Sequence, residues 1–303
     1  MGRMRQANVR RVFALCCVAA TSVATAQTRV VLLGTGNPNA NPERSGPAVA
    51  VLVNGSAYLV DAGPGVVRRA EAARRRGVAE LAQENLRIVF LTHLHSDHTL
   101  GLPDLMFTPW VVGREAPLDV YGPRGTAAMT RHLTAAYAED VRRRLDGRQP
   151  QNRTGWRVTP HEIGPGLVYA DSNVRVIAFR VPHGNWEEAY GYRFEAANRS
   201  IVISGDTRPS DAVVQACRGC DVLVHEAYSD AGFRTLPRAW QRYHASFHTS
   251  ASDLAALATR ARPGLLVLTH LLTWGGVPYD SILGEVRRGY GGRVVLGSDL
   301  DVY

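Results

Sequence analysis

Cysteine is scarce in this sequence, and its scarcity excludes one common kind of metal site. Four cysteines occur among 303 residues, and Cys217 and Cys220 form the single C-x-x-C pair. A zinc ribbon needs a second such pair, which the sequence lacks. The pair is left with two interpretations, a small local disulfide or two free thiols.

The sequence also lacks a repeat architecture, and its N-terminal apolar stretch is too short for a permanent membrane helix. A composition of 45% hydrophobic and 20% charged residues is typical of a globular domain. The apolar stretch covers residues 12–23, follows four arginines and precedes Ala24-Thr25-Ala26, a small-x-small cleavage sequence. This pattern predicts a signal peptide over residues 1–26, with an uncleaved anchor as the alternative.

A strong excess of positive charge is missing once the signal peptide is removed. The chain has 35 Lys and Arg against 27 Asp and Glu, a formal charge of +8. Four arginines leave with residues 1–26, so the remainder carries 31 − 27 = +4, which is no strong nucleic-acid footprint. We expect a periplasmic or secreted protein without a stable membrane anchor after cleavage. Arg10-Arg11-Val12-Phe13 resembles a twin-arginine export signal.

Strand and helix patterns alternate through residues 27–303 with no long linker, which predicts a single α/β domain. The predicted strands cover residues 29–33, 48–53, 57–60, 87–91, 119–121, 174–181, 190–194, 200–204, 221–224, 264–269 and 293–296. The predicted helices cover residues 66–76, 124–144, 211–217, 250–260 and 279–290.

The most specific feature present is the segment Thr92-His93-Leu94-His95-Ser96-Asp97-His98, directly after an apolar strand. Three imidazoles and one carboxylate lie so close together that they must stay hydrated or share a cation. Neutral imidazole and carboxylate suit zinc and its neighbours among the transition metals. The segment therefore predicts a metal site.

Further side chains with metal-ligand chemistry follow other predicted strands. They are His183, Asp206, the pair His225 and Glu226, and His270. Because ligands of α/β sheets bind outside the carboxyl ends of the strands, we expect five strands to deliver these groups to one edge.

Together these motifs resemble the metallo-β-lactamase superfamily. The H-x-H-x-D-H motif is His93, His95, Asp97 and His98, and the later motifs are matched by His183, Asp206 and His270. The resemblance implies an α/β fold, a single-domain four-layer αββα sandwich with two metal ions at one edge. His93, His95 and His183 would hold one ion, Asp97, His98 and His270 the other, and Asp206 would bridge them.

The implied cofactor is a pair of Zn²⁺ ions, although oxygen-rich bridging also admits manganese or iron. Two ions about 3.5–4 Å apart can share a carboxylate and an activated hydroxide. A single ion could not accommodate seven ligands, because zinc prefers four.

Finer matches resemble the branch that contains ribonuclease Z and secreted arylsulfatase-like enzymes. They are Leu33-Gly34-Thr35-Gly36, Gly101-Leu102-Pro103, Tyr121-Gly122-Pro123, Ala189-Tyr190-Gly191-Tyr192, Val224-His225-Glu226-Ala227 and His248-Thr249-Ser250. The resemblance implies that Glu226 and His248 assist departure of the leaving group, which makes Asp97, Glu226 and His248 the candidate catalytic residues. The alternatives are a structural hydrogen bond for Glu226 and a place at the start of a helix for His248.

Two departures from the resemblance guide the predicted function. Ribonuclease Z usually carries an arm that grips transfer RNA, but here one hairpin joins His183 to Asp206, which argues against transfer RNA as a partner. Zinc β-lactamases do not bridge their metals with an aspartate, which argues against antibiotic hydrolysis.

We therefore predict a dinuclear hydrolase of small anionic esters, aryl sulfate or phosphodiester, acting through a metal-bound hydroxide. The alternatives are a lactone, carboxylic ester or β-lactam hydrolase, a ribonuclease Z-like phosphodiesterase, or a metal-binding module without activity. Trp110, Trp156, Trp186 and Trp240 are candidates for an aryl pocket. The resemblance also allows a homodimer.

Overall fold

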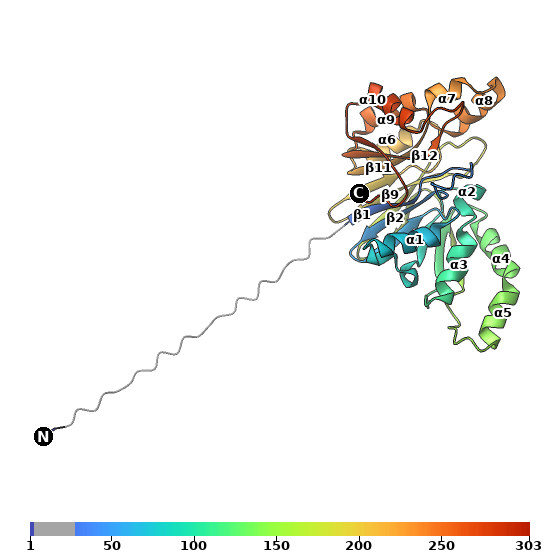
Figure 1. The fold of residues 1–303 in the computed structure, drawn as a ribbon, viewed down its shortest axis with the longest axis vertical. Coiled ribbons are helices and arrows are strands. Elements are labelled where there is room, and N and C mark those ends of the chain that lie inside the picture. Colours follow the sequence, from blue (N-terminus) through green and yellow to red (C-terminus); the bar gives the residue numbers. More distant parts are fainter. Residues whose placement is uncertain (3–27) are drawn as a thin grey trace.

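Two β-sheets pack face to face and helices cover their outer faces, in a computed structural model that describes residues 1–2 and 28–303. Figure 1 shows the first half of the chain, in blue and green, packed against the second half, in yellow and red. The predicted single-domain αββα sandwich is confirmed. The predicted signal peptide lies outside the described residues from residue 3 onward.

The first sheet follows chain order from one edge to the other. Its six strands are β1 (Thr28–Gly34), β2 (Ala48–Val53), β3 (Ser56–Val60), β4 (Ile88–Phe90), β5 (Leu118–Gly122) and β6 (Val158–Glu162). The first three pair antiparallel, and the rest pair parallel. Asn54 and Gly55 both have positive φ at the β2–β3 turn, as a type I′ hairpin requires.

The second sheet runs in the order β13-β12-β11-β10-β9-β8-β7. Its strands are β7 (Gly166–Ala170), β8 (Val174–Arg180), β9 (Tyr190–Ala196), β10 (Ser200–Ile203), β11 (Val222–Tyr228), β12 (Leu265–Leu272) and β13 (Val294–Leu296). Strands β10 to β13 pair parallel, so their carboxyl ends meet at one edge, where the metal-ligand residues lie.

Helices connect the strands on both outer faces. They are α1 (Val66–Arg75), α2 (Ser96–Thr99), α3 (Leu102–Val111), α4 (Thr126–Ala136), α5 (Ala138–Asp146), α6 (Asp211–Cys217), α7 (Asp230–Arg234), α8 (Arg238–Phe247), α9 (Ala251–Ala261) and α10 (Asp280–Gly289), with short 3-10 turns η1 (Ala79–Leu81) and η2 (Gln83–Asn85). Among the described helices, none combines the length and the apolar character that a membrane span requires.

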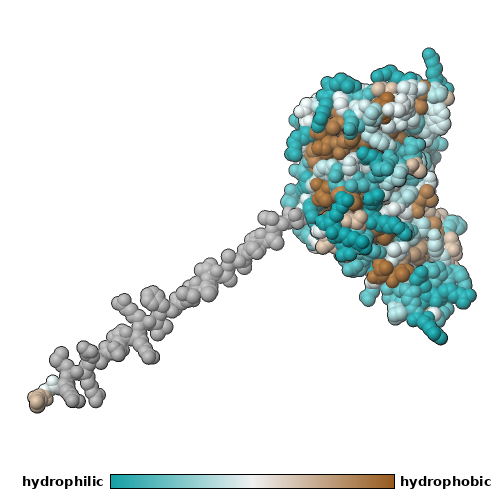
Figure 2. Space-filling model, in the orientation of Figure 1, coloured by the Kyte–Doolittle hydropathy of each residue, from teal (hydrophilic) through white to brown (hydrophobic). Residues whose placement is uncertain are grey.

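Three hydrophobic cores account for the four layers. One lies between the first sheet and its helices and includes Leu59 and Trp110; another lies between the second sheet and α6, α9 and α10. The third lies between the sheets, where Phe90 packs against Phe194. Figure 2 shows only separate hydrophobic patches on the visible face, among hydrophilic side chains. The apolar side chains of the strands are thus buried in these cores, and this packing fixes the position of the sheet edge that carries the site.

The structure differs from the sequence prediction where local pattern is weak. Residues 124–144 were predicted as one helix, but α4 and α5 are separated at Tyr137, whose ring packs on Phe107. Helix α3 was not predicted because Asp104 and Thr108 are its only polar residues and it contains two prolines. Strands β11 and β12 continue through Glu226 and His270, which were expected just beyond the strand ends.

The C-x-x-C pair forms a disulfide between Cys217 and Cys220 at the end of α6, which settles the two interpretations in favour of the local bridge. The arginines at 142–144 lie on α5 and pair with Glu139 and Asp140 of the same helix.

Candidate metal centre

The histidine-rich segment supplies its four polar groups from two kinds of backbone. His93 and His95 lie in the extended loop after β4, whereas Asp97 and His98 lie on the single turn of α2. The change from extended chain to helix turns the second pair of side chains away from the first. One short segment can therefore serve two neighbouring groups of ligands.

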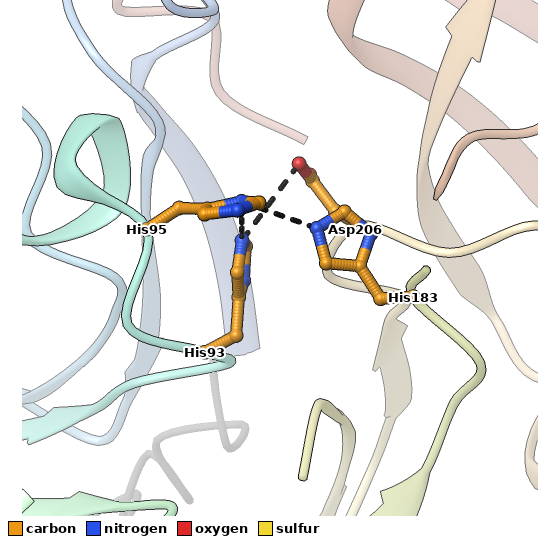
Figure 3. Close-up of side chains that lie close together, drawn as sticks. All are labelled: His93, His95, His183 and Asp206. Atoms are coloured by element: carbon orange, nitrogen blue, oxygen red, sulfur yellow. Dashed lines mark hydrogen bonds and ion pairs between the residues drawn. The ribbon is translucent and has the colours of Figure 1, made fainter. Parts of the chain in front are cut away.

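The first group brings three imidazoles together. His95 Nδ1 lies 2.9 Å from His93 Nε2 and 3.2 Å from His183 Nε2. Figure 3 shows these rings converging with Asp206, whose Oδ2 lies 4.0 Å from His93 Nε2. His183 comes from the loop after β8, so the group joins both sheets.

The second group is formed by Asp97, His98 and His270. Asp97 Oδ2 lies 3.2 Å from His270 Nε2 and 3.5 Å from His98 Nε2. Asp206 Oδ2 lies 3.4 Å from each of these two imidazole nitrogens. Asp206 thus contacts both groups, the position that a bridging ligand needs.

The residues present fit a pair of metal ions. The possible ligand atoms of the seven candidates form two sets, and within each set all atoms lie within 4.8 Å of one another. One set comes from His93, His95, His183 and Asp206, and the other from Asp97, His98 and His270. His98 Nε2 is buried and has no hydrogen-bond partner among the described residues. Buried nitrogens and carboxylates that converge without donors between them suit zinc.

The electrostatics favour neutral imidazoles in the first group only. Burial lowers the pKa of His183 to about 4 and that of His93 well below its usual value, so both rings are neutral. In the second group burial opposes protonation, but Asp206 and neighbouring carboxylates raise the pKa of His98 and His270, so these rings must lose a proton before they bind a metal ion. Burial opposes ionisation of Asp206, but His270 and His98 overcome it and hold the pKa of that carboxyl well below its usual value. The bridging carboxylate is therefore ionised while the first group stays neutral.

Asp61 supports the candidate centre from behind and was missed by the sequence reasoning. His98 Nδ1 donates to Asp61 Oδ2 over 2.8 Å, and the Thr92 backbone N–H donates to Asp61 Oδ1 over the same distance. This arrangement fixes the ring so that Nε2 faces the other ligands. The available signal was the position of Asp61 directly after a buried strand, the same pattern that identified the other ligands.

Trp186 contacts the first group in a way that competes with a metal. Its indole Nε1–H donates to His95 Nε2 over 2.8 Å. Indole is a donor only, so this bond favours a neutral His95 with its proton on Nδ1. Ligation through Nδ1 needs the opposite tautomer, and the indole must then turn away.

Glu226 and His248 lie together beside the second group. His248 Nδ1 is 3.1 Å from Glu226 Oε1, which also accepts from the Thr207 backbone N–H over 3.0 Å. Burial raises the pKa of Glu226, with the charge of Asp206 adding to the effect, and burial lowers the pKa of His248 to about 4. Asp206, His248 and His270 also form a set of possible ligands, so position alone permits a metal-binding role for His248.

The histidine and tryptophan residues that remain from the sequence prediction lie mostly outside the two ligand groups. His225 is buried on β11, with its Nδ1 against the Glu226 carbonyl. Trp110 is a core residue, and Trp156 lines a separate cavity beside α4 and α5. Of the four tryptophans proposed for an aryl pocket, Trp240 lines a cavity that reaches the metal centre through His248.

The chain belongs to the metallo-β-lactamase superfamily. Residues 57–271 match the family described as the β-lactamase superfamily domain, which covers most of both sheets and all seven candidate ligands.

Relatives and solved structures show which members of the superfamily this chain is similar to. Ribonuclease Z of Mycobacterium bovis (strain BCG / Pasteur 1173P2) is 33% identical over 275 residues, covering 89% of this chain and 96% of that protein. Ribonuclease Z of Mycobacterium sp. (strain KMS) is 36% identical over 245 residues, covering 80% and 84%. Human tRNase Z, short form, shares the fold with a TM-score of 0.66 and 24% identity, covering 91% and 98%. The metallo-β-lactamase fold protein YhfI from Bacillus subtilis has a TM-score of 0.70 and 18% identity, covering 91% and 99%.

These relatives contradict the prediction that argued against transfer RNA as a partner. The hairpin between His183 and Asp206 is short, as expected, because β9 and β10 are joined by residues 197–199. However, 275 aligned positions already cover 96% of the Mycobacterium bovis relative, so that ribonuclease Z has no room for a large additional arm. A short hairpin therefore cannot separate this chain from ribonuclease Z. The comparisons also give no support to aryl sulfate and favour the phosphodiesterase alternative.

Proposed function

We propose that this protein is a zinc-dependent phosphodiesterase of the ribonuclease Z type, which cleaves RNA and has transfer RNA precursors as its leading substrate class. The observation that carries the proposal is the hydrogen-bonded Glu226–His248 pair beside the seven converging ligands. The relatives named Ribonuclease Z support the same chemistry, because they match 89% and 80% of the chain at 33% and 36% identity.

The seven candidate ligands would hold the metal pair, with Asp206 between the two groups. When bound, the ions would supply Lewis acidity toward an anionic phosphodiester and an activated water molecule. Asp97, predicted as catalytic as well as ligating, lies close to His270 and can orient a water molecule through its carboxylate.

The Glu226–His248 pair supplies the proton for the departing oxygen as a unit. Neutral His248 gives up the proton on Nε2 while Glu226, whose pKa burial raises, passes its own proton to Nδ1. Glu226 Oε1 engages His248 at Nδ1, which fixes the ring and leaves Nε2 as the nitrogen that exchanges a proton. An imidazole oriented by a carboxyl group is suited to general acid catalysis, which contributes about 10²–10⁴-fold to rate. Burial of both groups excludes competing solvent from the bond that joins them.

The direct test is a substrate panel on metal-analysed protein that starts at residue 27. A transfer RNA precursor with a 3′ extension, bis(p-nitrophenyl) phosphate and p-nitrophenyl sulfate would be compared in zinc, manganese and iron. We expect metal-dependent cleavage of both phosphodiesters, and no comparable sulfate turnover. Sulfate turnover without phosphodiester cleavage would contradict the proposal.

Export is a separate proposal that supports no step of the chemistry. The arginines, apolar stretch and Ala24-Thr25-Ala26 sequence support cleavage after residue 26. Fractionation of cells that express the full chain, with mass analysis of the mature N-terminus, tests it. A cytoplasmic protein that retains residues 1–26 would contradict export but leave the proposed activity intact.

A further inference from the structure

A cavity of about 400 Å³ adjoins the metal centre and has an aromatic lining. Trp240, Tyr243 and His244 line it from α8, Trp274 lines it from the loop after β12, and His248 closes the side toward the ligands. This volume is at the small end of the range for ligand sites, so one ring system fits it better than a longer chain. The His244 side chain is half-buried in this lining.

Helix α8 presents its aromatic side chains on one face without a core to receive them. Positions 240, 243, 244 and 247 have the i, i+3, i+4, i+7 spacing of a single helix face. No residue of α8 is buried, and Trp240 and Tyr243 are 54% and 40% exposed. Large aromatic groups left open beside a reaction centre indicate a ligand surface.

The same helix is tied to the metal ligands at its C-terminal end. The Phe247 carbonyl accepts from His183 Nδ1 over 2.9 Å, and the Phe247 ring stacks on Tyr243 with centroids 4.4 Å apart. Gly184 has φ of +54°, and any Cβ there would collide with the Phe247 ring. The aromatic face is therefore held in a fixed position relative to the candidate ligand His183.

The aromatic lining of the cavity suits a nucleic-acid base. Aromatic rings that accept stacked bases are a usual means of binding single-stranded nucleic acid. The exposed Arg238 and Arg242 lie on the opposite face of α8 and do not line the cavity.

We propose that this cavity binds the base of the nucleotide on the leaving-oxygen side of the scissile phosphodiester, stacked against Trp240 and Tyr243. The side follows from His248, which lines the cavity and is the group that protonates the leaving oxygen. This assignment rests on the proposed function and adds to it the place where a base of the substrate binds.

The test combines rim variants with substrates that lack one base. Transfer RNA precursors would carry an abasic nucleotide on one side or the other of the cleaved phosphate, with product ends identifying the leaving-oxygen side. Protein variants would be Trp240→Ala and Tyr243→Ala, with Tyr137→Ala as the control, because Tyr137 is 42% exposed and lies between α4 and α5.

On the intact precursor we expect each rim variant to raise KM about tenfold or more, with little change in kcat and none in metal content. The wild type should lose a similar factor when the leaving-side base is removed, and the rim variants should then lose nothing further. The Tyr137→Ala protein should behave as the wild type on every substrate.

Three results would overturn the assignment. Rim variants that cleave the intact precursor as well as the wild type would remove it and leave the proposed function standing. Equal further losses on both abasic substrates would show a merely structural role for α8. Failure of the metal-loaded wild type to cleave any phosphodiester would reject the proposed function, and this assignment with it.

Discussion

The metal centre and the aromatic face of α8 lie next to each other but are built in opposite ways. The centre consists of buried polar side chains, several of them held by hydrogen bonds from the scaffold, such as that between His98 and Asp61. The α8 face consists of aromatic side chains that are partly exposed and touch mainly one another. The metal centre is thus suited to fix the geometry of a reaction, whereas the α8 face is the surface to which we assign stacking of the substrate.

Removal of the bridging carboxylate should affect the centre most. Asp206→Asn replaces a charged group that lies 3.4 Å from both His98 Nε2 and His270 Nε2. We expect kcat/KM to fall by about 10³-fold or more and the metal content to drop below two ions per chain. Metal analysis and phosphodiester kinetics measure this, with the exposed Asp211→Asn as the matched control. Full activity in Asp206→Asn would rule out the bridging role.

The Glu226–His248 pair marks the boundary between the two regions. In Glu226→Gln and His248→Asn we expect kcat to fall by about 10²–10³-fold, because the proton donor or its orientation is lost. Metal content should stay unchanged, since neither residue belongs to the predicted ligand set. Loss of a metal ion in His248→Asn would instead assign His248 to the ligand set that it forms with Asp206 and His270.

A variant of Asp61 tests how far zinc binding depends on the hydrogen bond that orients the His98 ring. Asp61→Asn keeps the shape but weakens the acceptor for His98 Nδ1, so we expect zinc affinity to fall by about 10–100-fold. Competition with a chelating dye measures the affinity, and thermal unfolding of the metal-free protein checks that the fold survives. An unchanged affinity would show that the ring is oriented by packing alone.

Trp186 should give the smallest effect, in the opposite direction. Trp186→Phe keeps an aromatic ring but removes the N–H that holds His95 in the tautomer unsuited to ligation through Nδ1. We expect zinc to bind about tenfold more tightly, which corresponds to the loss of roughly one competing hydrogen bond. The same dye competition measures it, and weaker binding would mean that Trp186 supports the ligand.

The sequence predicted which polar side chains come together because their pattern is local. Alternating groups after one strand, and single groups at the ends of other strands, must meet at one sheet edge once the strands pair in parallel. Glu226 and His270 illustrate the limit, since β11 and β12 run on through them and only their carboxyl-terminal placement was correct.

The rest of the site depends on contacts between distant segments. His183 and Phe247 are 64 positions apart, and the cavity beside His248 joins residues from Pro38 to Trp274. The prediction that argued against transfer RNA was wrong for a related reason. It relied on the length of one hairpin, whereas the similarity to ribonuclease Z extends over most of the chain.

By itself, the sequence determined the fold class, and its motifs, through the family that they resemble, predicted which side chains converge at one sheet edge, because short motifs and strand ends are local features. Only the tertiary structure decided which groups orient the ligands, that Trp186 opposes one of them, and that α8 places exposed aromatic rings beside His248. Those features come from packing two sheets and a distant helix around one edge, which no local pattern records.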